Sequence, residues 1–139
     1  MTAQLPPFPN LNANNFSLTS PETADYNCIA WAANDDTRWW WPGRAYWPNN
    51  RPSAETVDNF IDTFKLLGYT DSENDALEDG YIKVVLYVLD GVPTHMSRQL
   101  QSGKWTSKLG SWHDIEHNSP QDLEGPNYGQ VHCFLKKLV

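Results

Sequence analysis

The segment that restricts the fold most is the run YIKVVLYVL, which extends from Tyr81 to Leu89. Its β-branched and aromatic side chains pack well on a pleated surface and are typical of strands. The run therefore predicts a central strand of a sheet. Asp90-Gly91 follows it directly and predicts a turn that ends the strand.

Three later segments continue the strand pattern. Residues 94 to 100 (THMSRQL) and 104 to 109 (KWTSKL) predict two strands joined through Ser102-Gly103, and residues 130 to 138 predict a final strand. The second half of the chain thus predicts an antiparallel sheet.

The first half contains two helix signals. Ser53 is a suitable cap, and apolar residues then recur at helical spacing until Gly68 (Val57, Phe60, Ile61, Phe64 and Leu67). An earlier helix is expected to begin at Ser20, or else at Asp25, and either start places residues 26 to 32 in a helix. Helices that precede an antiparallel sheet indicate an α+β fold.

The remaining segments lack a regular period. Residues 1 to 24 are rich in proline and asparagine and predict an extended N-terminal arm. Residues 35 to 52 combine four tryptophans with prolines and a glycine, which is typical of an ordered aromatic loop. With 139 residues and no internal repeat, the chain is expected to form a single domain from 1 to 139.

The charge argues against two classes of partner. The formal net charge is −7 at pH 7 and the isoelectric point is about 4.8. Nucleic acids and anionic membranes are bound by clustered Lys and Arg, so we expect neither as a partner. No run approaches the roughly 18 apolar residues of a spanning helix, and the start lacks a signal peptide. We expect a cytoplasmic protein, or one exported by a specialised secretion system.

Cys28 and Cys133 are the only cysteines. A disulfide framework usually has more cysteines at closer spacing, so both are expected to be free thiols. The histidines do not fall at the spacing of a structural zinc site (His95, His113, His117 and His132). We therefore predict no metal and no cofactor.

Cys28 and His95 are the candidate reactive pair. A thiol is nucleophilic as the thiolate, and a helix start and a nearby imidazolium both lower the pKa of a cysteine. Cys28 lies early in the first predicted helix, and His95 opens a predicted strand that could present its ring to that helix. The pair would supply a nucleophile and a general acid/base. The alternative is structural: a small buried cysteine and a hydrogen-bonded strand histidine.

Two segments resemble the NlpC-type cell-wall cysteine peptidases of the papain-like superfamily: YNCIAWA (26–32) and THMSRQLQSGKWTS (94–107). The block WTSKLGSWHDIEH…LEGPNYG also resembles an uncharacterised bacterial family with the same Cys and His pattern. The resemblance implies a papain-like fold over residues 25–139, in which N-terminal helices pack on an antiparallel sheet. It also implies a thiol protease with Cys28 and His95 as catalytic residues.

The same resemblance suggests a third catalytic residue. In the NlpC-type family a polar residue lies twelve positions after the catalytic histidine, and that position here is Ser107. The family usually has His, Asn or Gln there, and a serine orients an imidazole less firmly. Asp114 or His117 is the alternative, if the segment HDIEH folds back beside His95.

Aromatic residues near the cysteine are expected to bind the substrate. Tyr26, Trp39, Trp40 and Trp41 would line a cleft, since aromatic walls are common in binding sites. The alternative for the tryptophans is packing in the core.

Three functions are compatible with these residues. The first is a cysteine hydrolase of amide or peptide bonds. Its expected partners are a peptide or protein substrate and a cognate inhibitor. Such a hydrolase could act as an effector or toxin. The second is a deamidase or acyltransferase, because a thioester can be resolved by water or by an amine. The third is a binding module without catalysis, whose contact surface is the Trp-rich loop.

Overall fold

The computed structural model describes residues 8–48, 54–109 and 113–139. The strands are β1 (Phe16–Leu18), β2 (Thr70–Ser72), β3 (Tyr81–Leu89), β4 (Val92–Gln99), β5 (Trp105–Lys108), β6 (Asp114–His117) and β7 (Gln130–Leu138). The helices are α1 (Cys28–Ala32) and α2 (Val57–Leu66), and a 3-10 turn, η1 (Pro120–Leu123), precedes β7.

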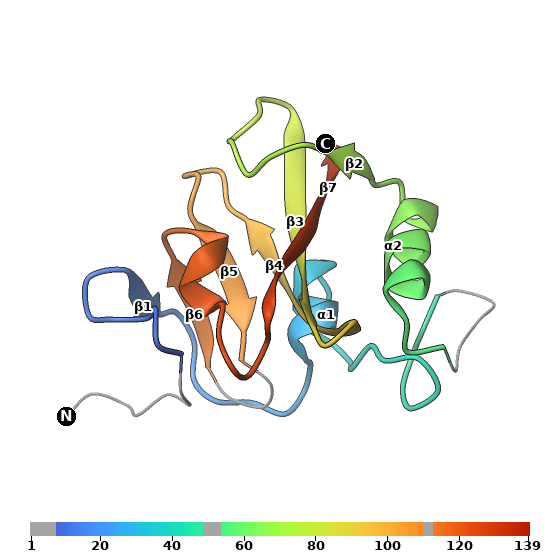
Figure 1. Ribbon diagram of the computed structural model, residues 1–139, viewed down its shortest axis with the longest axis horizontal. Helices are drawn as coiled ribbons and strands as arrows, with labels where there is room; N and C mark the ends of the chain where they lie inside the picture. Colours follow the sequence, from blue (N-terminus) through green and yellow to red (C-terminus); the bar gives the residue numbers. More distant parts are fainter. Residues whose placement is uncertain (1–7, 49–53, 110–112) are drawn as a thin grey trace.

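The strands form one seven-stranded sheet in the order β1-β6-β5-β4-β3-β7-β2. Each strand is antiparallel to its neighbours in the sheet. Figure 1 shows β1 and β6 toward one edge and α2 beside the other, next to β2. The four strands expected at residues 81–89, 94–100, 104–109 and 130–138 are confirmed with small shifts of their ends.

The expected α+β, papain-like fold with N-terminal helices is wrong. The sheet dominates, and the two α-helices of the described residues have only five and ten residues. The first helix is short because the side chain of Asn27 caps its start and Asn34 takes a left-handed φ of 66° just after its end. Residues 20–26 therefore stay outside the helix. Neither described helix has the length and apolarity needed to cross a membrane.

Three short strands were not expected: β1, β2 and β6. β1 lies in the predicted N-terminal arm and pairs with β6, so the described part of the arm adds an edge strand to the sheet. β6 is formed by most of the segment HDIEH. The expected cap Ser53 lies outside the described residues, and the helix there begins after Thr56, whose side chain accepts a hydrogen bond from Asn59 N–H.

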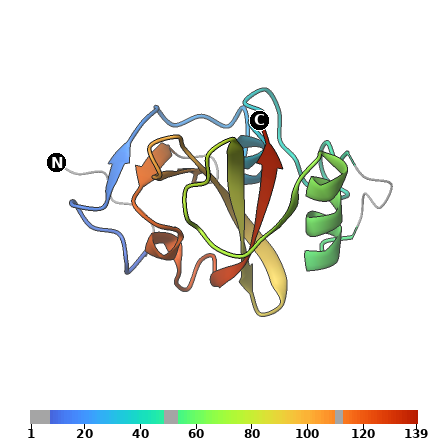
Figure 2. The same ribbon diagram turned by 90° about the horizontal axis from the view of Figure 1, so that it is seen from above.

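The sheet separates two apolar clusters. On the helix side, α1 and α2 cover strand residues such as Leu86 and Met96. The opposite face of the sheet, which η1 covers, is called the turn side. There Tyr87 and Trp105 pack with Leu123 of η1. Figure 2 shows α1 and η1 on opposite sides of the central strands. Because side chains alternate between the faces of a strand, the register decides to which side each residue of β4 points.

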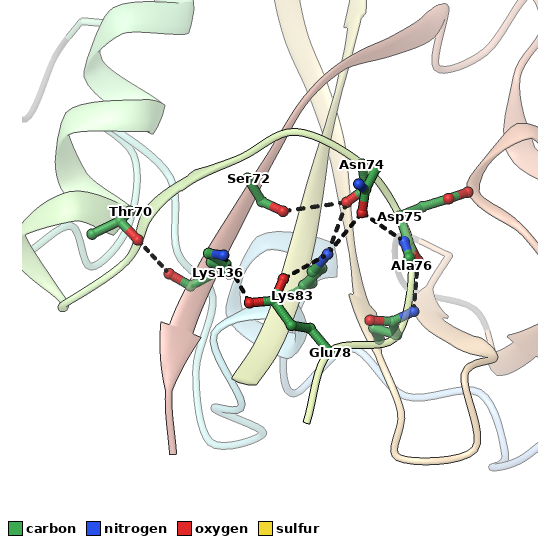
Figure 3. A network of polar contacts seen from close by, with 9 residues as sticks. Thr70, Ser72, Asn74, Asp75, Ala76, Glu78, Lys83 and Lys136 are labelled. Atoms are coloured by element: carbon green, nitrogen blue, oxygen red, sulfur yellow. Dashed lines mark hydrogen bonds and ion pairs between the residues drawn. The ribbon is translucent and has the colours of Figure 1, made fainter. Parts of the chain in front are cut away.

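A buried lysine fixes the loop that precedes β3 (Figure 3). Lys83 is 1% exposed, and its Nζ lies 3.1 Å from both the backbone and the side-chain oxygen of Asn74. The Glu78 carboxylate lies 3.5 Å from the Lys83 ammonium and 2.8 Å from that of Lys136. The buried charge is thus matched by partners, as stability requires.

Candidate active site at Cys28 and His95

Cys28 is brought to the strand that carries His95. It is the first residue of α1 and is 7% exposed. Its Sγ lies 4.0 Å from the Thr94 carbonyl oxygen, and the Met96 N–H also points to the sulfur. These two backbone groups stand on either side of His95. Residues that are far apart in the sequence therefore meet at one point of β4.

The sulfur contacts β4 beyond the point where β5 pairs with that strand. The two strands pair only through Arg98 and Gln99 of β4. In an antiparallel strand alternate residues direct their backbone groups to opposite neighbours, so Thr94 and Met96 face the same way as Arg98. The Thr94 C=O and the Met96 N–H therefore face the side of β5, and it is the sulfur of Cys28 that they contact there. Cys28 thus contacts the edge of β4 that faces β5, next to the His95 backbone.

The imidazole of His95 is fully buried, and none of the described residues forms a hydrogen bond with it. His95 is directly opposite Tyr87 in the register, so its side chain points to the turn side. Its exposed fraction is 0%, and its ring stacks on Tyr128 with centroids 4.0 Å apart and an interplanar angle of 8°. Neither ring nitrogen has a hydrogen-bond partner in the part of the chain that the structure describes. Buried polar groups nearly always have such a partner, so this one is exceptional.

Burial keeps both members of the pair neutral. It raises the pKa of the Cys28 thiol to about 11. Burial, and then the charge of His117, hold the pKa of His95 well below its ordinary value. The resting pair is therefore a thiol and a neutral imidazole, and the described residues show no hydrogen bond between them. The expectation of a lowered Cys28 pKa is wrong, because desolvation outweighs the backbone N–H groups that point to the sulfur.

Ser107, the expected third residue, bonds to a different histidine. Its Oγ lies 2.8 Å from Nε2 of His117 and 2.5 Å from Oγ of Ser97. All three side chains are fully buried on the turn side. The hydroxyl that was expected to orient His95 is used in this network.

Asp114, the alternative third residue, is paired with Tyr26. The Tyr26 hydroxyl donates to Asp114 Oδ2 over 2.5 Å. Burial and this carboxylate raise the pKa of Tyr26 to about 12, so the phenol remains a donor at neutral pH. Among the described residues, no hydrogen bond joins Asp114 or His117 to His95.

The three adjacent tryptophans have different environments. Trp40 is buried in the helix-side cluster, whereas Trp39 is 39% exposed and Trp41 is half-buried. Trp39 and Trp41 line a pocket of about 450 Å³ together with Arg44, Ala45 and Glu55. Trp40 is not part of this pocket.

Sequence reasoning missed Asn27 and Tyr128. The Asn27 amide bonds to both the C=O and the N–H of Trp40, at 2.9 and 3.1 Å, and so ties the aromatic loop to the residue before Cys28. An asparagine before a helical run is a recognised capping signal, but Ser20 and Asp25 offered competing starts. For Tyr128, nothing in its local sequence indicates that it stacks on His95.

The described residues contain no group of three or more His, Cys, Asp or Glu that could hold a metal ion. Both cysteines are free thiols, as expected. Comparison with the curated proteins and with the solved structures finds no match. One family model matches residues 17–136, and its description is a domain of unknown function, DUF7689. Because this match spans most of the sequence, the chain belongs to the DUF7689 family.

Proposed function

We propose that the protein is a cysteine-dependent hydrolase of amide or peptide bonds, with Cys28 as nucleophile and His95 as general acid/base. The observation that carries the proposal is the fully buried imidazole of His95, which has no hydrogen-bond partner among the described residues and lies on the strand that the Cys28 sulfur touches. An unsatisfied buried polar group destabilises a fold by about 1–3 kcal/mol. A proton acceptor kept free on the strand that the thiol touches would give this cost a chemical purpose.

In the first half of the reaction, neutral His95 accepts the thiol proton while the sulfur attacks the carbonyl carbon. The carbon–sulfur bond forms and the carbonyl electron pair moves onto oxygen. The backbone N–H groups of Cys28 and Ile29 already point to the sulfur and would donate to this oxygen. The imidazolium then protonates the leaving amine, the carbon–nitrogen bond breaks, and a thioester remains on Cys28.

In the second half, His95 removes a proton from water, which attacks the thioester. The acid is released and the imidazolium returns its proton to the sulfur of Cys28. An amine in place of water would give acyl transfer, and a side-chain amide as substrate would give deamidation. These alternatives use the same two residues.

The neutral resting pair predicts a distinctive pH profile. A reaction of free thiolate becomes about tenfold faster per pH unit below the thiol pKa. With a Cys28 pKa of about 11, that rise would extend across the whole neutral range. A reaction assisted by neutral His95 is independent of pH above the lowered pKa of that imidazole.

The test uses p-nitrophenyl acetate as the acyl donor and mass spectrometry to follow acetylation of Cys28. The proteins in which Cys28 is followed all carry Cys133→Ser. We expect a rate that is constant across the neutral range. In His95→Ala the rate at pH 7 should fall about 100-fold, and the tenfold rise per pH unit should appear.

Cys133 provides a matched control. Burial raises its pKa to about 11 as well, and its charged neighbours are Asp71 and Lys65 rather than a histidine. In Cys28→Ser, acetylation of Cys133 should show the steep rise of an unassisted thiolate. If Cys28 follows the same steep profile, or is indifferent to His95→Ala, the hydrolase proposal fails.

A binding module without catalysis is the second candidate. The raised pKa of Cys28 and the pocket of Trp39 and Trp41 favour it. A Cys28 thiol no more reactive than Cys133 in the acetylation test would leave this candidate in place of the hydrolase.

A further inference from the structure

We infer that Tyr128 is the positioning residue for His95, and that its stacked ring takes the role that a hydrogen-bonded third residue has in other Cys–His pairs. The inference rests on the proposed function, which it deepens, because a ring is positioned for chemistry only if it takes part in a reaction. The experiment therefore measures the titration of His95 as well as the acetylation of Cys28.

The imidazole packs against two aromatic rings, whose own centroids are 6.3 Å apart. Tyr128 lies parallel to it at 4.0 Å, and Tyr87 is tilted against it by 59° at a centroid distance of 5.2 Å. Offset and tilted arrangements of this kind are the favourable ones for aromatic rings. With an exposed fraction of 0%, His95 has little freedom to change its rotamer.

Tyr128 is itself anchored to the strand that carries His95. Its carbonyl oxygen accepts a hydrogen bond of 2.6 Å from the Thr94 hydroxyl, one residue before His95. Its ring also packs against Phe8, with centroids 5.1 Å apart. The position of Tyr128 relative to His95 is thus fixed by both backbone and side chain.

The loop around Tyr128 is closed by backbone hydrogen bonds and lies close to β3. Gly125 and Gly129 exchange two backbone hydrogen bonds of 3.0 and 2.8 Å, which close the loop. Gly129 has a φ of +77°, and a Cβ there would lie 2.0 Å from the Val88 carbonyl oxygen. Only glycine fits at this position, so the loop is held close to β3.

Stacking has a chemical advantage over a hydrogen bond at this site. An orienting hydroxyl or amide would occupy one nitrogen of the imidazole. Contact through the ring face leaves both nitrogens of His95 without a protein partner, as observed among the described residues. Ser107 and Asp114, the residues that could have served instead, bond to His117 and Tyr26.

The titratable groups around His95 determine its pKa. Tyr87 faces it from β3, Tyr128 from the loop, and Cys28 lies at the backbone of the same strand. His117 on β6 is the nearby group whose positive charge would oppose protonation of His95. Without the Tyr128 ring, water would reach the imidazole, so the pKa of His95 should rise toward its ordinary value.

The experiment follows the imidazole proton resonances of His95 against pH by NMR, with His95→Gln used for assignment. Wild type and Tyr128→Phe should show no titration of His95 between about pH 5 and 8. Tyr128→Ala should bring its titration into that window, and acetylation of Cys28 by p-nitrophenyl acetate should become pH-dependent at the same midpoint. Tyr81→Ala, a half-buried tyrosine of β3 whose ring packs against Lys136, is the matched control and should behave as wild type.

An unchanged titration in Tyr128→Ala overturns the inference, and so does a shift in Tyr128→Phe as large as that in Tyr128→Ala. If Tyr128→Ala does not fold, Thr94→Val removes the hydroxyl that anchors Tyr128 and should shift His95 in the same direction by less; no shift there also overturns the inference. A shifted His95 beside an inert Cys28 refutes the proposed function alone. A reactive Cys28 with an unshifted His95 refutes only the role of Tyr128.

Discussion

Two buried histidines on the turn side of the sheet, His95 and His117, have opposite surroundings. Both have an exposed fraction of 0%. His117 lies 2.8 Å from the Ser107 hydroxyl through Nε2 and 2.8 Å from the Ser119 carbonyl through Nδ1. His95 has no partner at either nitrogen within the described part of the chain.

The partners of His117 assign each of its nitrogens a fixed role. A carbonyl can only accept, so Nδ1–H donates to Ser119, and Nε2 therefore accepts from the Ser107 hydroxyl. Ser107 in turn accepts from Ser97. Every member of this network is satisfied, which is the pattern of a stabilising group. The contrast indicates that His117 contributes to stability, whereas His95 makes no such contribution and, under the proposed function, is available for chemistry.

Replacing His95 by leucine should have the largest effect on the acetylation rate of Cys28 without lowering the free energy of unfolding. We expect acetylation of Cys28 at pH 7 to fall about 100-fold, since the proton acceptor is lost. The free energy of unfolding should stay equal or rise by up to about 1–3 kcal/mol, because no hydrogen bond is broken and an unsatisfied buried polar group is removed. Urea denaturation and mass spectrometry measure the two quantities. A large loss of stability with intact acetylation would reverse the assignment.

The same substitution at His117 should give the opposite result. His117→Leu leaves the Ser107 hydroxyl and the Ser119 carbonyl without their partner, so the free energy of unfolding should fall by about 2–4 kcal/mol. Acetylation of Cys28 in the folded protein should be unchanged. Equal stability of the two leucine variants would remove the contrast between the histidines.

Ser107→Ala tests the residue that the sequence pattern favoured as the third catalytic member. The change leaves Nε2 of His117 unpaired, and we expect the free energy of unfolding to fall by about 1–2 kcal/mol. The pH-independent acetylation rate of Cys28 should persist, because Ser107 bonds to His117 and no hydrogen bond joins it to His95 in the described part of the chain. A rate that falls as in His95→Leu would restore Ser107 to the catalytic role.

The pH dependence of stability should report the burial of both histidines. Burial lowers the pKa of both His95 and His117 in the folded state. The unfolded chain therefore binds more protons below about pH 6.5, so the stabilisation is complete above that pH and is lost as the pH falls. Each histidine contributes a slope of at most about 1.4 kcal/mol per pH unit. Urea denaturation at pH 5 and 7 should show a reduced slope in His95→Leu; an identical slope would argue against a buried neutral His95.

The elements with a long local pattern could be predicted from the sequence. The β-branched run of β3 and the helical period of α2 are properties of consecutive residues, and both elements formed where expected. β1, β2 and β6 contain only three or four residues, too few to carry a period. The predicted fold class was wrong in part because the first helix is shorter than expected. It was predicted to begin at Ser20 or Asp25, but the side chain of Asn27 caps it, so that it begins only at Cys28.

The sequence by itself also determined which side chains could react, since the candidates followed from residue type and from the resemblance of their segments. Only the tertiary structure decided their partners. The Tyr26–Asp114 bond joins residues 88 positions apart. The stack of Tyr128 on His95 depends on a loop returning to one place on β4, and a shift of one residue in register would turn His95 to the other face of the sheet. Such contacts depend on register and loop closure, which no local pattern of residues encodes.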